Sequence, residues 1–183
     1  MRIAITTWHS GPNAGTFLQL YGLYHYLTKR GHHVEVIDYI QKDKRDMYPR
    51  GWYYYFSQPL PIIKRKNQRA KYNNLLAKST LPFIKEISNR DKRFIDEYVK
   101  MSFTKPISTD DDFAKLNELF DVFIVGSDQI WNSSMLNRRY FLNYVHSDKI
   151  KASYAPSMGS GTVLSFQRKI FRRELMSFNY VST

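Results

Sequence analysis

The residues best suited to chemistry in this chain lie in segment 126–132, whose sequence is Gly-Ser-Asp-Gln-Ile-Trp-Asn. The segment follows the apolar run 123–125, which is typical of a buried strand. Open parallel sheets bind ligands in a crevice just outside the carboxyl ends of their strands. Carboxylate and amide groups there offer directional hydrogen bonds to hydroxyls or phosphate, and an indole ring offers a stacking face. The residues of this segment expected to bind substrate are Ser127, Asp128, Gln129, Trp131 and Asn132.

The same segment also fits a purely structural role. In that alternative Asp128 caps a helix, Gln129 is solvated and Trp131 packs on the sheet. The sequence leaves both interpretations open, although so polar a constellation is rarely needed merely to turn a chain.

Two further loops are expected at the same edge of the sheet. Loop 9–15, which contains Asn13 and Gly15, opens onto a helix N-terminus, where backbone N–H groups favour an anion. The glycine spacing of this loop differs from that of dinucleotide-binding loops, so a flexible turn is the alternative. Loop 156–161, which contains Ser157, follows a later strand and would converge on the same place.

Groups for catalysis are sparse. The chain has no cysteine, which excludes thiol chemistry and disulfides, and it shows no metal-ligand spacing. Of its five histidines, only His9 lies on an expected binding loop, as a weak candidate for a general acid. Ser127 and Ser157 lack a convincing base nearby in sequence. The catalytic residues are therefore unknown at this level, and neither a metal nor a cofactor is expected.

The elements that must position these loops follow an α/β pattern. The first forty residues predict a strand, a loop, a helix and a second strand that closes on Asp38. The same rhythm returns after residue 110. It predicts a Rossmann-like parallel sheet flanked by helices, in a single domain covering 1–183. The expected elements are strands at 3–6, 34–37, 121–125 and 150–155 and helices at 17–27, 110–120 and 166–178.

The net charge of +12 is concentrated in the middle of the chain. Residues 41–105 hold sixteen basic and six acidic side chains, and they include an aromatic cluster at 47–56. We expect a helical insertion here. Its basic and aromatic surface suits an anionic membrane or an acidic polymer, whereas the lack of a recognised binding motif argues against nucleic acid. No apolar run is long enough to span a membrane and no signal peptide is visible, which predicts a cytoplasmic protein.

At these loops the chain resembles the polysaccharide pyruvyl transferase family. The most specific match is the block Gly-Ser-Asp-Gln-x-Trp-Asn at 126–132, and the other matches keep the family's order and spacing along essentially the whole chain. Two departures are Ala14, where an aromatic residue is usual, and Pro156, which interrupts the third loop. The other matches are Phe94 and the segments 3–6, 13–15, 18–27, 31–39, 121–125, 140–142 and 153–159.

The resemblance implies a transferase of exopolysaccharide biosynthesis. Such enzymes move the pyruvyl group of phosphoenolpyruvate, a donor substrate rather than a cofactor, onto two hydroxyls of a sugar. The acceptor would be a cell-surface glycan or its lipid-linked precursor. The resemblance also implies two facing Rossmann-like domains, similar to the GT-B glycosyltransferases, with the donor-binding arginines and catalytic histidine mainly in the second. It assigns Asn13, Gly15, Ser127, Asp128, Gln129 and Asn132 to acceptor binding and loop shaping.

The chain is expected to correspond to the first of those two domains, because Thr183 lies about where the second begins. Three alternatives stay open: a non-catalytic glycan-binding module, a truncated and inactive one, or half of a GT-B-type glycosyltransferase. A domain without its partner exposes apolar surface, so self-association is expected. The protein would be cytoplasmic, with peripheral contact at the inner face of the membrane.

Overall fold

The computed structural model describes residues 1–9, 14–39, 46–48, 96–132, 136–159, 163 and 165–182. The chain divides into two compact units, Met1–Tyr48 with Tyr98–Thr183, and Pro49–Glu97. Of the second unit, only residues 96 and 97 belong to the described part. The first unit carries the sheet and all the elements named below.

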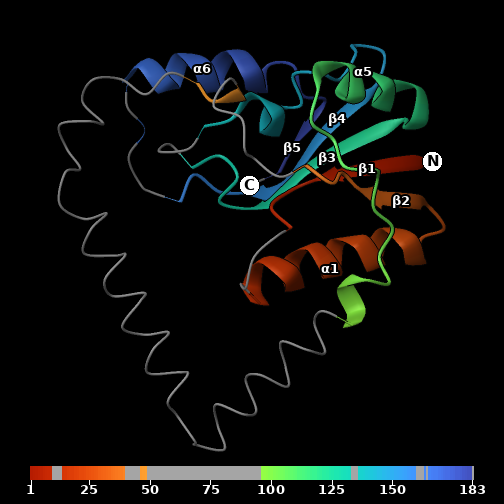
Figure 1. The fold of residues 1–183 in the computed structure, drawn as a ribbon. Coiled ribbons are helices and arrows are strands. Elements are labelled where there is room, and N and C mark those ends of the chain that lie inside the picture. The colour runs from red at the N-terminus through yellow and green to blue at the C-terminus, as the bar shows by residue number, and fades with distance from the viewer. Residues whose placement is uncertain are drawn as a thin grey trace, which may run out of the picture. The chain divides into compact units, whose positions relative to one another are not determined.

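A five-stranded parallel sheet forms the centre of the first unit, in the order β2-β1-β3-β4-β5 (Figure 1). In the central register, Ile5 of β1 lies beside Ile124 of β3, which in turn lies beside Ala152 of β4. The α/β fold predicted from the sequence is thus confirmed. The strands are β1 Arg2–Thr6, β2 His33–Val36, β3 Val122–Asp128, β4 Ile150–Pro156 and β5 Tyr180–Val181.

Helices cover both faces of this sheet. Helix α1 (Ala14–Lys29) lies on one face, and α5 (Asp110–Leu119) and α6 (Ser165–Leu175) lie on the other (Figure 1). Because strand side chains alternate between faces, β1 contributes Ile3 and Ile5 to the core beneath α1 and Ala4 to the core beneath α5 and α6. A short 3-10 helix, η2 (Arg138–Phe141), packs into the second core.

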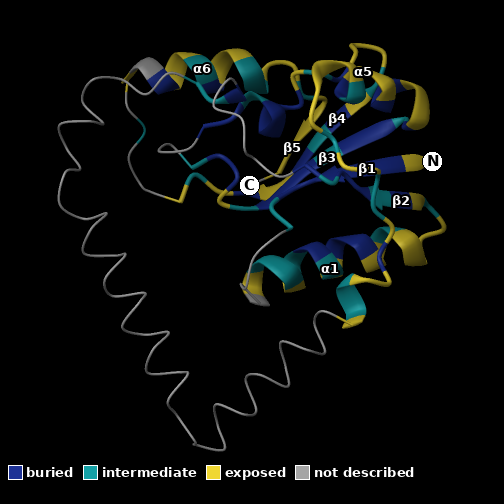
Figure 2. Cartoon of the chain, in the orientation of Figure 1, coloured by how far each residue is buried: buried dark blue, intermediate teal, exposed yellow. Residues whose placement is uncertain are grey.

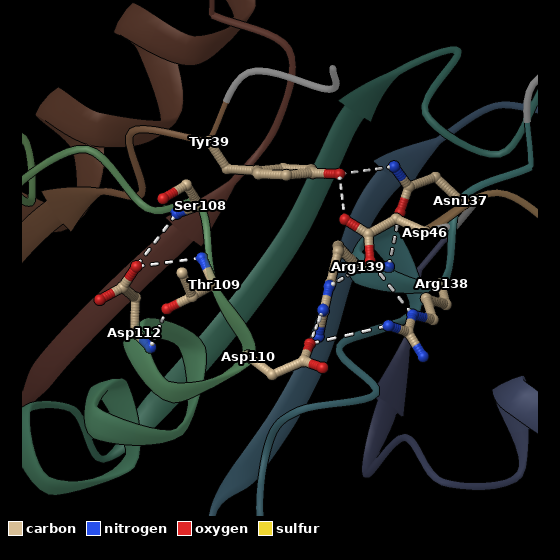
Figure 3. Close-up of polar contacts among 9 residues, drawn as sticks. All are labelled: Tyr39, Asp46, Ser108, Thr109, Asp110, Asp112, Asn137, Arg138 and Arg139. Carbon is tan, nitrogen blue, oxygen red and sulfur yellow. Dashed lines mark hydrogen bonds and ion pairs between the residues drawn. The ribbon is translucent and has the colours of Figure 1, made fainter. Parts of the chain in front are cut away.

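Local sequence sets where α5 begins. Thr109 Oγ1 accepts the N–H of Asp112 at 3.1 Å, and Asp112 Oδ2 accepts the N–H of Thr109 at 3.0 Å. This reciprocal capping box satisfies two backbone donors that the helix itself cannot (Figure 3). The Thr109 side chain, followed by the backbone N–H groups of Thr109 and Ser108, lowers the pKa of Asp112. The acidic first turn therefore starts the helix as the sequence predicts.

The expected helical insertion at 41–105 lies for the most part outside the described residues and stays a prediction. Of its last residues, 96–98 are helical and 101–104 are extended chain beside β2. Val36 donates its N–H to the Ser102 carbonyl at 2.9 Å, and Thr104 donates its N–H to the Val36 carbonyl at 3.0 Å. Met101 is buried in the core beneath α1. Residues 101–104 thus extend the sheet edge where helix was expected.

Burial follows this layered arrangement. The central strands are buried, whereas the outward sides of α1, α5 and α6 are exposed (Figure 2). Among the described helices, none combines the length and apolar character needed to cross a bilayer.

Candidate functional site

The sheet order creates a topological switch point between β1 and β3. From β1 the chain proceeds to β2 on one side, whereas β3 leads to β4 and β5 on the other. Open α/β sheets bind ligands where strand order reverses in this way, outside the carboxyl ends of the strands. We call the segments there the switch-point loops: 7–9 with the first turn of α1 (14–16), 126–132, and 156–159.

A glycine allows β3 to approach β4 at this edge. Gly126 has a φ of +122°, and a Cβ added there would overlap the carbonyl oxygen of Tyr154. Any other residue would therefore clash with the neighbouring backbone. This close approach explains why segment 126–132 begins with a glycine.

Asp128 connects all three switch-point loops. Its Oδ2 accepts the hydroxyl of Thr16, in the first turn of α1, at 2.8 Å. Its Oδ1 accepts the N–H of Gln129 at 2.7 Å, and its carbonyl accepts the N–H of Ser157 at 2.8 Å. A carboxylate at a helix N-terminus interacts favourably with the helix dipole. Asp128 thus supplies from within the chain an anion at the helix end where the sequence predicted an anion site.

The amide side chains of the second loop lie against the third loop. Asn132 Nδ2 donates to Gln129 Oε1 at 3.3 Å, and a Cβ at Gly159 would lie 2.6 Å from that same oxygen. Gly159 has a φ of +68°, and its N–H donates to Ser157 Oγ at 3.0 Å. Gln129 and Ser157 are exposed and Asn132 is partly buried. The structure therefore brings these three predicted residues together at one accessible edge.

Ser127 lies beneath that edge and is 7 % exposed. Its carbonyl accepts the hydroxyl of Thr7, which follows β1, at 3.2 Å. Its own Oγ is buried and has no hydrogen-bond partner within the described part of the chain. A buried hydroxyl without a hydrogen-bond partner reduces the stability of the fold by about 1–3 kcal/mol. Such an atom is therefore a candidate for a hydrogen bond to a ligand or a water molecule.

Trp131 corrects one prediction. The residue is 2 % exposed, its ring stacks parallel to Phe141 with centroids 5.5 Å apart, and Phe171 and Phe178 meet it edge-on. Its Nε1–H donates to the Tyr140 carbonyl at 2.8 Å. With its ring enclosed and its donor satisfied, the indole is a core residue and offers no stacking face to a sugar. The structural alternative holds for this residue.

His9, the weak catalytic candidate, is enclosed as well. Its side chain is 3 % exposed, and its Nδ1 shares a 2.7 Å hydrogen bond with the Tyr98 hydroxyl. Its Nε2 lies 3.5 Å from Asp38 Oδ1, without hydrogen-bond geometry. Burial lowers the pKa of His9, although the charge of Asp38 opposes the shift. Burial, followed by the charge of Asp38, raises the pKa of Tyr98 to about 12. His9 therefore ties Tyr98 to the end of β1.

The remaining predicted site residues are placed as follows. Gly15 lies exposed in the first turn of α1. Asn13 lies outside the described residues, and its role stays a prediction. Sequence reasoning missed Thr7 and Thr16, whose hydroxyls join the loops. A hydroxyl residue at the end of a strand or in a first helical turn is the only signal that could have indicated them.

A buried polar network that the sequence did not predict lies beside the core under α5 (Figure 3). Tyr39 donates its hydroxyl to Asp46 Oδ2 at 2.9 Å and accepts from Asn137 Nδ2 at 2.9 Å. Arg139 Nε donates to Asp46 Oδ1 at 2.9 Å, and its other end pairs with Asp110. Burial is the main cause that raises the pKa of Tyr39. The network joins segments far apart in sequence and has a structural role.

No group of histidine and acidic side chains that could hold a metal ion occurs among the described residues. The chemistry available at the switch-point loops is hydrogen bonding by hydroxyl, amide and carboxylate groups. This set suits a polyhydroxylated ligand, because such groups can both donate to and accept from hydroxyls.

Comparison with known proteins identifies the family of the chain. No curated protein sequence and no solved structure matches the chain. The family model described as polysaccharide pyruvyl transferase matches residues 13–183, a range that includes the second and third switch-point loops and the first turn of α1. The chain therefore belongs to the polysaccharide pyruvyl transferase family.

Proposed function

We propose that this chain binds the sugar acceptor of a pyruvyl transfer reaction at the switch-point loops, with phosphoenolpyruvate as donor. The observation that carries the proposal is the polar set at the carboxyl edge of β3 and β4, formed by Asp128, Gln129, Asn132 and Ser157. Paired hydroxyls on a sugar ring complement such mixed donors and acceptors.

The charge of the switch-point loops indicates which of the two substrates they fit. Phosphoenolpyruvate carries a carboxylate and a phosphate, which call for lysine or arginine. The described residues of the switch-point loops include the acidic Asp128 and neither lysine nor arginine. A neutral sugar therefore fits these loops better than the donor does. The buried Ser127 Oγ is a further hydroxyl that a ligand or a water could satisfy.

The reaction itself has two stages. In the first, one sugar hydroxyl attacks C2 of the enol phosphate and gives up its proton while a proton is added to C3, so that the alcohol adds across the double bond. In the second, the C2–O bond to phosphate breaks as the other hydroxyl attacks C2 and releases its proton, giving a cyclic ketal and inorganic phosphate. Holding both hydroxyls in place makes the second attack intramolecular, which lowers its entropic barrier. The switch-point loops supply this positioning in the proposal.

Phosphate release and acceptor binding test the proposal together. The chain is incubated with phosphoenolpyruvate and a panel of methyl glycosides, and products are examined by mass spectrometry for one added pyruvyl group. Binding of each glycoside is followed by NMR titration. Saturable binding with phosphate release supports the full reaction. Saturable binding without release supports the alternative of a glycan-binding module, and no binding by any glycoside contradicts the proposal.

Paired amide variants localise the site. Gln129→Ala with Asn132→Ala should weaken glycoside binding at least tenfold, since two hydrogen bonds of about 1 kcal/mol each are lost. Asn143→Ala, which removes an exposed amide outside the switch-point loops, is the matched control. Equal loss in both variants would contradict the assignment.

A further inference from the structure

The outward face of helix α6 carries more positive charge than the described residues around it neutralise. The helix contains four basic residues and one acidic residue. Phe171 and Gln167 are buried and fix the inward face, whereas the basic side chains are exposed (Figure 2). The basic residues of this face are Arg168, Lys169, Arg172 and Arg173.

The charges on this face are mostly uncompensated. Arg173 pairs with Glu174, the single acidic residue, through a 2.7 Å contact. Arg168 donates to the backbone carbonyl of Val163 at 3.4 Å, which leaves its charge in place. Lys169 and Arg172 have no ion-pair partner among the described residues. Within the described part of the chain, the face therefore keeps three positive charges without an ionic partner, spaced over little more than one helical turn.

An exposed apolar side chain lies in the same row of side chains along α6 as two of these basic residues. Met176 follows Arg168 and Arg172 at four-residue spacing and is 79 % exposed. Cationic side chains with an adjacent exposed apolar group suit the headgroup region of an anionic bilayer, where both are stabilised. A hydrated polyanion would attract the cations equally well, but it would give the thioether no apolar surroundings. The combination favours a lipid surface.

We propose that the α6 face, made by Arg168, Lys169, Arg172 and Met176, docks the protein on a bilayer containing anionic lipid. The helix stays at the surface and does not insert, because its apolar side packs in the core. The centroid of the Phe171 ring lies 6.3 Å from that of Trp131 and 5.4 Å from that of Phe141. Adsorption should accordingly be reversible and weaken with salt. The proposal does not require the sugar site to be active.

Docking here would bring the third switch-point loop close to the bilayer. Helix α6 begins at Ser165, shortly after Gly159, the last described residue of that loop. A sugar attached to a lipid carrier would then be presented to the loops from the membrane side. This link rests on the proposed function, whereas the docking surface does not.

Vesicle binding by the full chain tests the proposal. The probe is a vesicle of equal parts phosphatidylcholine and phosphatidylglycerol, compared with phosphatidylcholine alone. Wild type should bind only the anionic vesicle. R168Q/R172Q should lower the partition coefficient about 25-fold, since each basic residue near such a surface contributes roughly a factor of five. M176Q should lower it by a smaller factor and should leave binding to dextran sulfate unchanged.

The matched control removes the same net charge elsewhere. K29Q/R30Q takes two exposed basic residues from the end of α1, on the opposite face of the sheet (Figure 1). Binding by this variant should equal that of wild type, and thermal unfolding should show that both double variants stay folded. The proposal is overturned if the two double variants lose binding equally. It is also overturned if R168Q/R172Q loses affinity for dextran sulfate while vesicle binding is unchanged, which would favour an acidic polymer.

Discussion

Asp128 combines a strained backbone with a central position among the loops. Its φ of 81° lies in the left-handed region, which aspartate and asparagine adopt more readily than most residues. Its carboxylate bonds Thr16 across 112 positions of sequence. The sequence indicated a polar residue here but not its partner, because contacts between distant segments leave no local signal.

Asp128→Asn tests this role while retaining a residue that tolerates the backbone. We expect a loss of about 1 kcal/mol in the free energy of unfolding, because the charged hydrogen bond from Thr16 is weakened. Thr16→Val removes the donor. Chemical denaturation of both single variants and the double variant should reveal coupling between the two sites. Strict additivity would show that the contact does not stabilise the fold.

Gly126 and Gly22 form a contrasting pair. Gly126→Ala should destabilise the protein by more than about 3 kcal/mol, because its φ is positive and the new methyl group meets the Tyr154 carbonyl. Gly22→Ala, in α1 with no atom beyond the adjacent residues and the local helix backbone within 4 Å of the new Cβ, should stabilise it by about 0.5–1 kcal/mol. Thermal unfolding measures both. A folded Gly126→Ala with unchanged stability would contradict the close approach of β3 and β4.

Trp131 shows what residue types alone cannot decide. An indole after a buried strand suits a binding surface as well as a core, because it has both an apolar ring and one donor. Its role as a core residue follows from its neighbours, because Phe141 from η2 and Phe171 from α6 enclose the ring. The positions of those neighbours depend on the completed fold, so local sequence could not separate the two roles.

At the scale of elements, periodicity predicted the strands and helices well. Each of the four predicted strands and three predicted helices has a counterpart, with ends that differ by a few residues. The exceptions are short. β5 and η2 and the extended stretch 101–104 are too short for a period to be visible, and they exist because a neighbouring strand or core accepts them.

His9, which follows β1, is expected to make the stability of the fold depend on pH. The pKa of His9 is lowered in the folded protein, so just below its ordinary value of about 6.5 the unfolded chain binds more protons. Stability should therefore be full above pH of about 6.5 and fall as the pH decreases towards the folded pKa. Thermal unfolding between neutral and mildly acid pH measures this slope.

Two variants assign the slope to His9. His9→Gln should flatten it, since the buried imidazole is no longer present to be protonated, at the expense of some stability at neutral pH. His146→Gln changes an exposed histidine and is the matched control. The assignment is wrong if the His146 variant flattens the slope and the His9 variant keeps it.

At the scale of the whole molecule, the network around Asp46 joins distant parts of the first unit. It connects the chain after β2 with η2 and the first residue of α5 (Figure 3). Asp46 and Arg139 are 6 % and 5 % exposed. Removing one partner of a buried ion pair leaves the other charge without compensation, which is costly.

Asp46→Asn should lower the free energy of unfolding by about 3 kcal/mol, because Arg139 stays buried with a weaker acceptor. The contrasting variant is Asp121→Asn, which breaks the exposed pair with Arg2, where solvent screens the charges. That pair lowers the pKa of Asp121 to about 2, yet its loss should have a much smaller effect on unfolding at neutral pH. Denaturant titrations compare the two. Equal effects would contradict a structural role for the buried network.

The strand order also has a consequence for translation. β1 is synthesised before β2 and can pair with it early, but its other neighbour is β3, so Ile3 cannot pair with Val122 until β3 has been made. A two-stranded sheet is marginal in water, so the nascent β1-α1-β2 unit stays incomplete while the whole middle of the chain is made. The centre of the sheet therefore closes only after β3 is made, and until then the β1-α1-β2 unit exposes an unpaired strand edge that needs protection from aggregation.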